Sequence, residues 1–225
     1  MARPTDAPVP SAAAVLDDAV RALAPDAGAN RLVPRIAAGA APRSVFATFA
    51  LEQHQVIAAD GMSFRHLARR ADGDPPVAGF FDLLAEGETL AMEQLAAPAD
   101  ACELTEGQIA DYAPRPGCQA YPSYAARLAL GAEPADVVIA LTANFAAWGG
   151  YCATLATAMR DHYAFPESAR GFFTFFAEPA PALDDAARAA LQHGLDTGRA
   201  RSGTAHRYGR LLQAYELMFW NALAD

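Results

Sequence analysis

The stretch PADVVIALTANFAAWGGYCATLATAMRDHYA, residues 134–164, decides the fold. Its residues are apolar on almost every side of a helix, and a helix of that kind is buried in the core of a protein. Elsewhere apolar residues also recur at helical spacing, and no run alternates in the manner of a β-strand bounded by hairpin turns. The sequence therefore predicts a single all-α domain with a bundle-like core over residues 11–225.

The other predicted helices lie on both sides of this stretch, and short loops marked by Pro or Gly separate them. One of them, over residues 43–70, is long and is expected to bend near Gly61. Residues 1–10 are rich in Pro and Ala and are predicted to be disordered. The remaining helices are predicted over 11–24, 75–97, 106–113, 122–130, 167–178, 183–198 and 204–225.

Composition excludes several classes of function. The net charge is −9, which argues against binding to a nucleic-acid backbone, since phosphate needs a cationic surface. The chain has no Lys, so a lysine Schiff base is excluded. No apolar run is judged to reach the roughly 18 residues of a membrane span, and no signal-peptide core is present. The three cysteines are too few for a disulfide framework, and we expect reduced thiols in a cytoplasmic protein.

Motifs for phosphate, nucleophilic serine and metal chemistry are missing. The chain has no Walker loop, no GxGxxG and no GxSxG. A di-iron bundle would carry Glu-x-x-His pairs on two helices, and none of the five histidines stands in one. Glu52 and His54, two residues apart, point to different faces of a helix. The sequence therefore predicts no metal and no cofactor.

The final segment, AYELMFWNALAD (214–225), resembles the C-terminal signature of the TenA/thiaminase-II family, in which Tyr-Glu precedes Phe-Trp on the last helix. Three further segments, 29–46, 118–148 and 172–178, resemble family segments in the same order. The resemblance implies a heme-oxygenase-like helical fold and a homo-oligomer, a dimer or tetramer. It also implies a pocket for thiamine or an aminopyrimidine, where a Cys nucleophile, an Asp, a Glu and several Tyr break a C–N bond without a metal.

Two family residues are present at matching positions of this chain. The family glutamate falls on Glu216 and the tyrosine of its Ala-Tyr motif falls on Tyr121. Burial among aromatic rings would raise the pKa of Glu216 toward neutrality and suit it to proton transfer. Alternatively, Glu216 lies on a solvated stripe of the helix or pairs with Arg210. Tyr121 is either a hydrogen-bond donor to a ligand or a core aromatic.

Several family residues are replaced. The nucleophilic cysteine falls on Ala146, and Cys152, six residues later, is rotated by about 240° and cannot simply replace it. The pyrimidine-binding aspartate falls on Gln53, and a tyrosine one turn later falls on Val56. The other predicted pocket residues are Glu52 beside Gln53, Phe176 in place of a tyrosine, Trp148, and Tyr151 next to the tyrosine position at Gly150.

Without a thiolate, covalent attack on the pyrimidine has no agent. Three hypotheses follow. The first is a diverged enzyme that acts on a small heterocyclic or amine-bearing molecule by acid–base chemistry through Glu216 and Tyr121, with thiamine salvage by a non-standard mechanism as its variant. The second is a non-catalytic binding or regulatory protein. The third is a bundle oxygenase, which the missing metal spacing disfavours.

Overall fold

The computed structural model describes residues 10–26 and 28–225, so the predicted disorder of residues 1–10 lies almost entirely outside the described residues. The described chain is helical throughout and contains no strand, which confirms the predicted all-α class. The elements are α1 (Ala12–Ala22), α2 (Val33–Ala37), α3 (Ser44–Arg70), α4 (Pro75–Ala101), α5 (Glu106–Ala110), α6 (Pro116–Gly131), α7 (Pro134–Asp161), the 3-10 helix η1 (Ser168–Arg170), α8 (Gly171–Ala177), α9 (Pro181–Asp196) and α10 (Ser202–Ala224).

Prolines explain the largest differences from the predicted helix bounds. We expected one helix to end before Pro98 and another to begin at Pro122, because proline lacks the N–H that continues a helix. Instead α4 continues through Pro98, and α6 begins earlier, at Pro116, so that Pro122 lies in its interior. Both internal prolines are buried, so packing against neighbouring helices outweighs the lost backbone hydrogen bond. Helix α3 is a single helix from Ser44 to Arg70 that continues through Gly61.

Helix α7 forms the centre of the core, as its apolar sequence predicts. The run Val137–Leu141 is at most 1% exposed, and α7 packs against α10, α8, α1, α2 and α9. By length and composition, α7 is also the single helix of the described chain that could cross a membrane, so the expectation that no apolar run reaches this length was wrong. Its contacts show that the same composition serves a bundle core.

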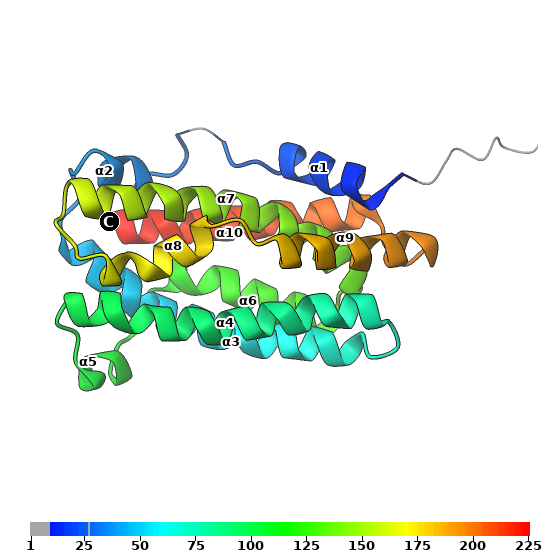
Figure 1. Cartoon of the computed structure of the whole chain (residues 1–225), viewed down its shortest axis with the longest axis horizontal. Coiled ribbons are helices and arrows are strands. Elements are labelled where there is room, and N and C mark those ends of the chain that lie inside the picture. Colours follow the sequence, from blue (N-terminus) through cyan, green and yellow to red (C-terminus); the bar gives the residue numbers. More distant parts are fainter. Residues whose placement is uncertain (1–9, 27) are drawn as a thin grey trace, which may run out of the picture.

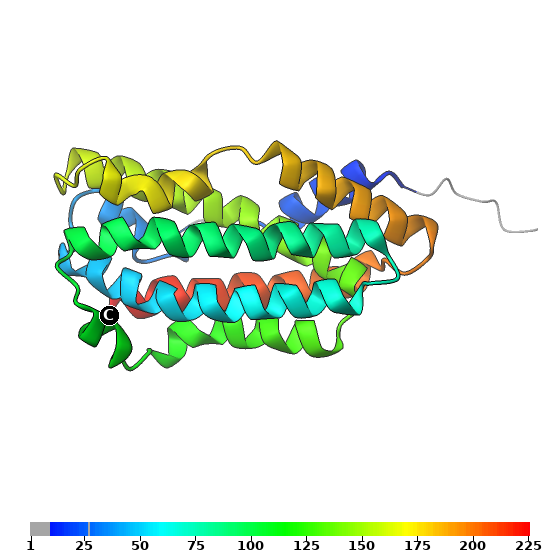
Figure 2. The same cartoon turned by 60° about the horizontal axis from the view of Figure 1, so that its bottom comes forward.

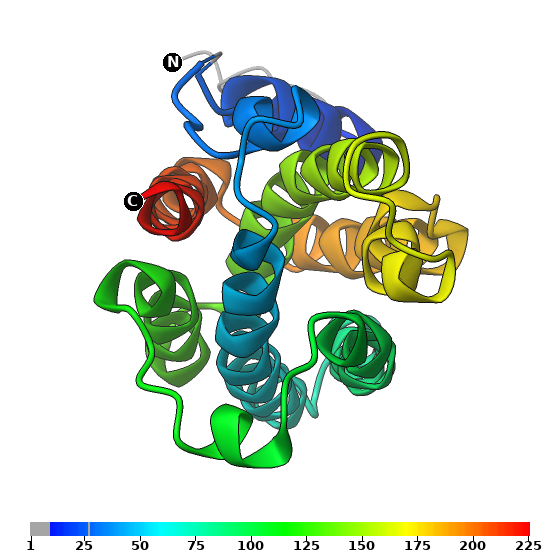
Figure 3. The ribbon, with the colours of Figure 1, turned by 90° about the vertical axis from the view of Figure 1, so that its left-hand side faces the viewer.

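The long helices lie roughly along one axis. Helices α4, α3 and α6 run side by side, and α10 packs against α6 and α7 (Figures 1 and 2). Viewed from one end, α3 passes through the middle, with α6 and α10 on one side and α4 and α8 on the other (Figure 3). Side chains from the middle of α3 therefore face several helices at once.

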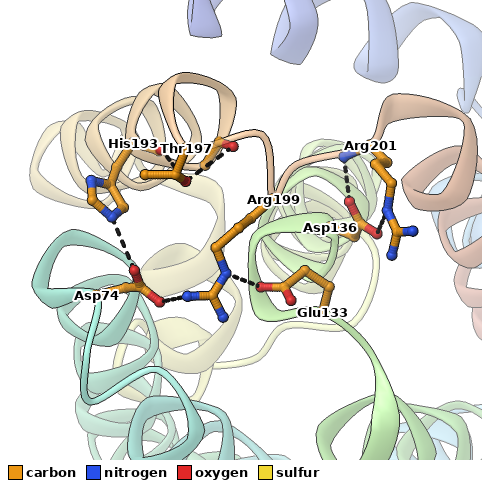
Figure 4. A network of polar contacts seen from close by, with 8 residues as sticks. Asp74, Glu133, Asp136, His193, Thr197, Arg199 and Arg201 are labelled. Carbon is orange, nitrogen blue, oxygen red and sulfur yellow. Dashed lines mark hydrogen bonds and ion pairs between the residues drawn. The ribbon is translucent and has the colours of Figure 1, made fainter.

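A polar network joins three connections at one end of the bundle (Figure 4). Asp74, at the start of α4, accepts a hydrogen bond from Arg199 and contacts His193 Nε2 through Oδ1 at 3.0 Å. Arg199 Nε also donates to Glu133, at the start of α7, at 3.1 Å. Because Arg199 lies between α9 and α10, it ties that loop to the starts of α4 and α7.

Candidate functional site

A cavity that opens to solvent lies between six helices. Its walls are mainly apolar with a few polar groups, as in pockets that bind small molecules. Helix α3 supplies four lining residues at helical spacing, α7 supplies three, α10 two, and α4, α6 and α8 one each. The lining residues are Gln53, Val56, Ile57, Asp60, Glu88, Tyr121, Asn144, Phe145, Trp148, Phe176, Glu216 and Phe219.

Glu216 lies in the wall of this cavity and is held by two donors. Its side chain is 5% exposed. Asn144 Nδ2 donates to Oε2 at 2.6 Å, and Trp220 Nε1 donates to Oε1 at 3.1 Å. Burial raises the pKa of Glu216 to about 7, against the opposing effect of both hydrogen bonds, which favour the carboxylate. Both protonation states are therefore populated near neutral pH.

Neighbouring groups fix the two donors in place. Asn144 Nδ2 also lies 3.5 Å from Gln213 Oε1, and Gln213 Nε2 donates to the carbonyl oxygen of Ala143 at 3.2 Å. The ring of Trp220 lies 5.2 Å from that of Trp148, centroid to centroid. The carboxyl group of Glu216 thus has a defined orientation. Among the described residues, Glu216 forms no ion pair with Arg210.

Aromatic rings form the apolar part of the cavity. Trp148 contacts Phe176 edge to face at 5.9 Å and Phe219 at 6.3 Å. Phe49, behind them, lies 6.3 Å from Trp148 and 5.8 Å from Phe219. A wall of this kind binds flat apolar groups and the faces of its rings attract cations.

Two further carboxyl groups enter the cavity, Asp60 from α3 and Glu88 from α4. Burial raises the pKa of Asp60 to about 8. Burial and the negative charge of Asp60 raise the pKa of Glu88 well above its ordinary value. Burial, and then the charges of Asp60, Glu216 and Glu88, raise the pKa of the Tyr121 hydroxyl well above its ordinary value.

Six of the nine residues predicted for the site line the cavity: Glu216, Tyr121, Gln53, Val56, Trp148 and Phe176. The cavity lining does not include the other three, which are Glu52, Tyr151 and Ala146. Sequence reasoning missed Asp60, Glu88 and Asn144. Asp60 stands seven residues after Gln53, on the same face of α3, and Asn144 interrupts an apolar run, so both carried a signal that was overlooked.

The three residues outside the lining have other surroundings. Glu52 is fully buried and accepts hydrogen bonds from the Tyr112 hydroxyl at 2.7 Å, the Arg115 backbone N–H at 2.8 Å and the Gln119 amide at 3.1 Å, so it ties α3 to the start of α6. Tyr151 packs edge to face on Trp220 at 5.4 Å. Ala146 is exposed on the surface of α7.

No cysteine lies in the cavity wall. Cys118 and Cys152 are buried, and Cys102 is partly buried. Burial, and then the charge of Glu52, raise the pKa of the Cys118 thiol to about 12. Burial also raises the pKa of Cys152 well above its ordinary value. Both buried thiols are therefore protonated at neutral pH and are poor nucleophiles. Within residues 10–26 and 28–225, no three or more His, Cys, Asp or Glu side chains are placed to hold a metal ion.

Comparison with known proteins gives a fold and no close sequence relative. No protein-family model and no curated protein sequence matches the chain. Among solved structures, a TenA homologue from P. horikoshii OT3 superposes with a TM-score of 0.65 at 14% identity, covering 94% of this chain and 93% of the other. A TenA homologue from Pseudomonas syringae pv. tomato superposes with a TM-score of 0.69 at 13% identity, covering 96% of each chain. The chain therefore has the heme-oxygenase-like helical fold of the TenA homologues over nearly its whole length.

Proposed function

We propose that this chain is a diverged TenA-type enzyme that acts on a small heterocyclic or amine-bearing molecule by acid–base chemistry. The observation that carries the proposal is Glu216, a carboxyl group in the wall of a small-molecule cavity with its pKa raised to about 7. A general acid or base works best when its pKa lies near the operating pH. The alternative of a solvated or ion-paired Glu216 does not fit its 5% exposure and its neutral hydrogen-bond donors.

Glu216 can exchange a proton with a bound ligand without losing its position. Each carboxylate oxygen accepts one hydrogen bond from the protein, and a carboxylate has about four acceptor sites, so free lone pairs are left for the ligand. The Asn144 and Trp220 donors stabilise the negative charge that forms when Glu216 gives up its proton. Burial favours the protonated state instead. Because burial and the two hydrogen bonds oppose each other, the carboxyl group serves as an acid or as a base near neutral pH.

The class of ligand follows from the walls. Carboxyl groups on α3, α4 and α10 suit a ligand that carries a basic nitrogen, and the Trp148, Phe176 and Phe219 rings suit a flat ring attached to it. Tyr121 lines the same cavity, and its proposed role is to donate a hydrogen bond from its hydroxyl to the ligand. The buried, protonated thiols argue against covalent catalysis by cysteine.

The test is turnover, followed by mass spectrometry, of thiamine, formylaminopyrimidine and aminopyrimidine, with a thermal-shift measurement of the same mixtures. Wild type is compared with Glu216→Gln, and with Glu86→Gln as a control, because Glu86 is an exposed glutamate on α4. Turnover that Glu216→Gln abolishes and the control keeps supports the proposal and names the substrate. Extending the panel to other heterocyclic amines covers a changed substrate.

A substrate that Glu216→Gln turns over at the wild-type rate would refute the assigned role. Ligand binding without turnover across the whole panel would instead favour a binding or regulatory protein that kept the cavity and lost the chemistry. The homo-oligomeric state and cytoplasmic location stay predictions.

A further inference from the structure

Asp60 and Glu88 also line the cavity, besides Glu216, and one carboxyl oxygen of Asp60 has no hydrogen-bond partner among the described residues. Asp60 is 5% exposed and lines the cavity. Its Oδ1 atom is buried and accepts no hydrogen bond from any residue that the structure describes. A buried carboxyl oxygen without a donor costs about 1–3 kcal/mol or more, so such an atom in a cavity wall is available to accept a hydrogen bond from a bound ligand.

Glu88 lies next to Asp60 because α3 and α4 approach closely at Gly61. A Cβ atom at position 61 would lie 3.5 Å from Glu88 Cβ, at ordinary van der Waals distance, so α3 at Gly61 lies directly beside the stem of Glu88. Asp60 is the residue before this contact. The two carboxyl groups therefore enter the cavity from adjacent helices, at the same level of the bundle.

Positive charge is scarce around this pair. The nearby cation on α3 is Arg65, whose Nη1 would lie 3.3 Å from a Cβ atom at position 61, while its Nη2 donates to Thr89 at 3.4 Å. No Arg or His of the described chain forms an ion pair with Asp60 or Glu88. The other titratable groups that face the pair are Tyr121 from α6 and Glu216 from α10, and neither carries a positive charge.

We propose that Asp60 and Glu88 form a carboxyl pair that binds the ammonium group of the ligand. The proposal rests on the proposed function for the class of ligand and adds where its basic nitrogen lies. The proposal also separates cation binding from proton exchange. Asp60 and Glu88 bind the ammonium group, while Glu216 on α10 exchanges a proton with the part of the ligand that reacts.

Electrostatics explains how the pair works. Asp60 is buried and Glu88 is half-buried beside it, so the two carboxyl groups do not ionise together easily, and with its pKa raised to about 8 Asp60 holds its proton at pH 7. An ammonium group donates to the unpaired Oδ1 of Asp60 and supplies the missing positive charge. As the ammonium ion binds, the O–H bond of Asp60 breaks and its proton passes to solvent, so one positive and one negative charge are added and the net charge of the cavity does not change.

Benzylamine and benzyl alcohol are suitable probes, because they share a ring and a size and differ in the charged group. Titration calorimetry at pH 7 in two buffers of different ionisation enthalpy measures both affinity and proton release. We expect wild type to bind benzylamine at least about 10-fold more tightly than benzyl alcohol, since a hydrogen bond to a charged group contributes about 1.5–3 kcal/mol. We also expect net proton release with the amine alone.

Two variants test which residues cause the preference for benzylamine over benzyl alcohol. Asp60→Asn is expected to weaken benzylamine binding about 10-fold or more and to abolish proton release, with benzyl alcohol unchanged. Glu88→Gln, expected to act in the same direction, serves if the first variant does not fold. The matched controls are Asp82→Asn and Glu86→Gln, both at exposed positions of α4, which should bind both probes as wild type does.

The proposal is overturned if wild type binds neither probe, if it binds the two equally, or if Asp60→Asn and Glu88→Gln keep the full preference for the amine. Glu216→Gln distinguishes this result from failure of the proposed function. If that variant keeps the Asp60-dependent preference while no substrate is ever turned over, the ammonium site stands and the catalytic proposal fails.

Discussion

Glu216 should make the stability of the protein depend on pH in a way that one substitution removes. In the unfolded chain its pKa is the ordinary 4.5, and in the folded protein burial raises it to about 7. Between these values the folded state holds a proton that the unfolded state has released. The free energy of unfolding therefore falls as pH rises from 4.5 to 7, and the contribution of Glu216 is constant below and above this window.

The size of the effect follows from the shift. The rise in the pKa of Glu216 from 4.5 to about 7 corresponds to a change of about 3 kcal/mol in the free energy of unfolding, at 1.36 kcal/mol for each pKa unit. Glu216→Gln removes the titration but also disturbs the bonds to Asn144 and Trp220, because an amide offers one acceptor oxygen where the carboxylate offers two. That loss, about 1–2 kcal/mol, is the same at every pH. The change with pH therefore isolates the ionisation.

Urea denaturation of wild type and Glu216→Gln at pH 5 and pH 8 gives the required difference. We expect wild type to lose about 3 kcal/mol more than the variant between these two values. The pKa values of Asp60 and Glu88 are also raised, but both residues are present in both proteins, so their contributions largely cancel. Glu86→Gln, at an exposed position, should follow the wild-type curve.

Parallel stability curves for wild type and Glu216→Gln would refute the reasoning. They would mean that the carboxyl group titrates at its ordinary pKa, so that it is solvated in the folded protein. The case for Glu216 as an acid–base group would then fail as well.

Three other substitutions test separate parts of the structure. Trp220→Phe removes a donor to Glu216, so the pKa of that carboxyl should rise above about 7, which the same pair of denaturation curves would show as a wider pH window. Gly209→Ala places a methyl group against Leu23, and we expect a loss of about 1–3 kcal/mol in urea denaturation that Leu23→Ala partly restores; additive effects would exclude the contact. Glu52→Ala leaves three donors without their acceptor and should cost about 2–4 kcal/mol, whereas an unchanged unfolding midpoint would contradict the bonding described.

Much of the fold could be predicted because it depends on short-range patterns. Helical spacing of apolar residues marks the long helices, and the apolar run from Val137 to Leu141 marks the central one. The largest errors in the predicted helix bounds occur at prolines. Pro98 and Pro122 look like helix boundaries in the sequence, but tertiary packing holds them inside helices, and no local pattern carries that information.

The site was harder, because a cavity is made by distant segments. Glu216 and Gln53 were both assigned to the site from the resemblance, because the place of Glu216 in the last helix left a solvated carboxyl group open as the alternative. Ala146 was assigned by its distance in sequence from a tryptophan, but it lies on the exposed surface of α7, while Asn144 on the same helix reaches Glu216. No sequence pattern marked Glu88, because its place in the cavity depends on the contact between α3 and α4 at Gly61.

The two tryptophans of this chain have a practical consequence. The sequence contains only two, Trp148 and Trp220, and their ring centroids are 5.2 Å apart beside the cavity. One forms part of the cavity wall, and the other donates its indole N–H to Glu216. All indole fluorescence of the protein therefore originates within a few ångströms of the proposed reaction site. The unlabelled protein thus carries its own optical reporter, whose emission should respond to occupancy of the cavity and to the ionisation of one carboxyl group.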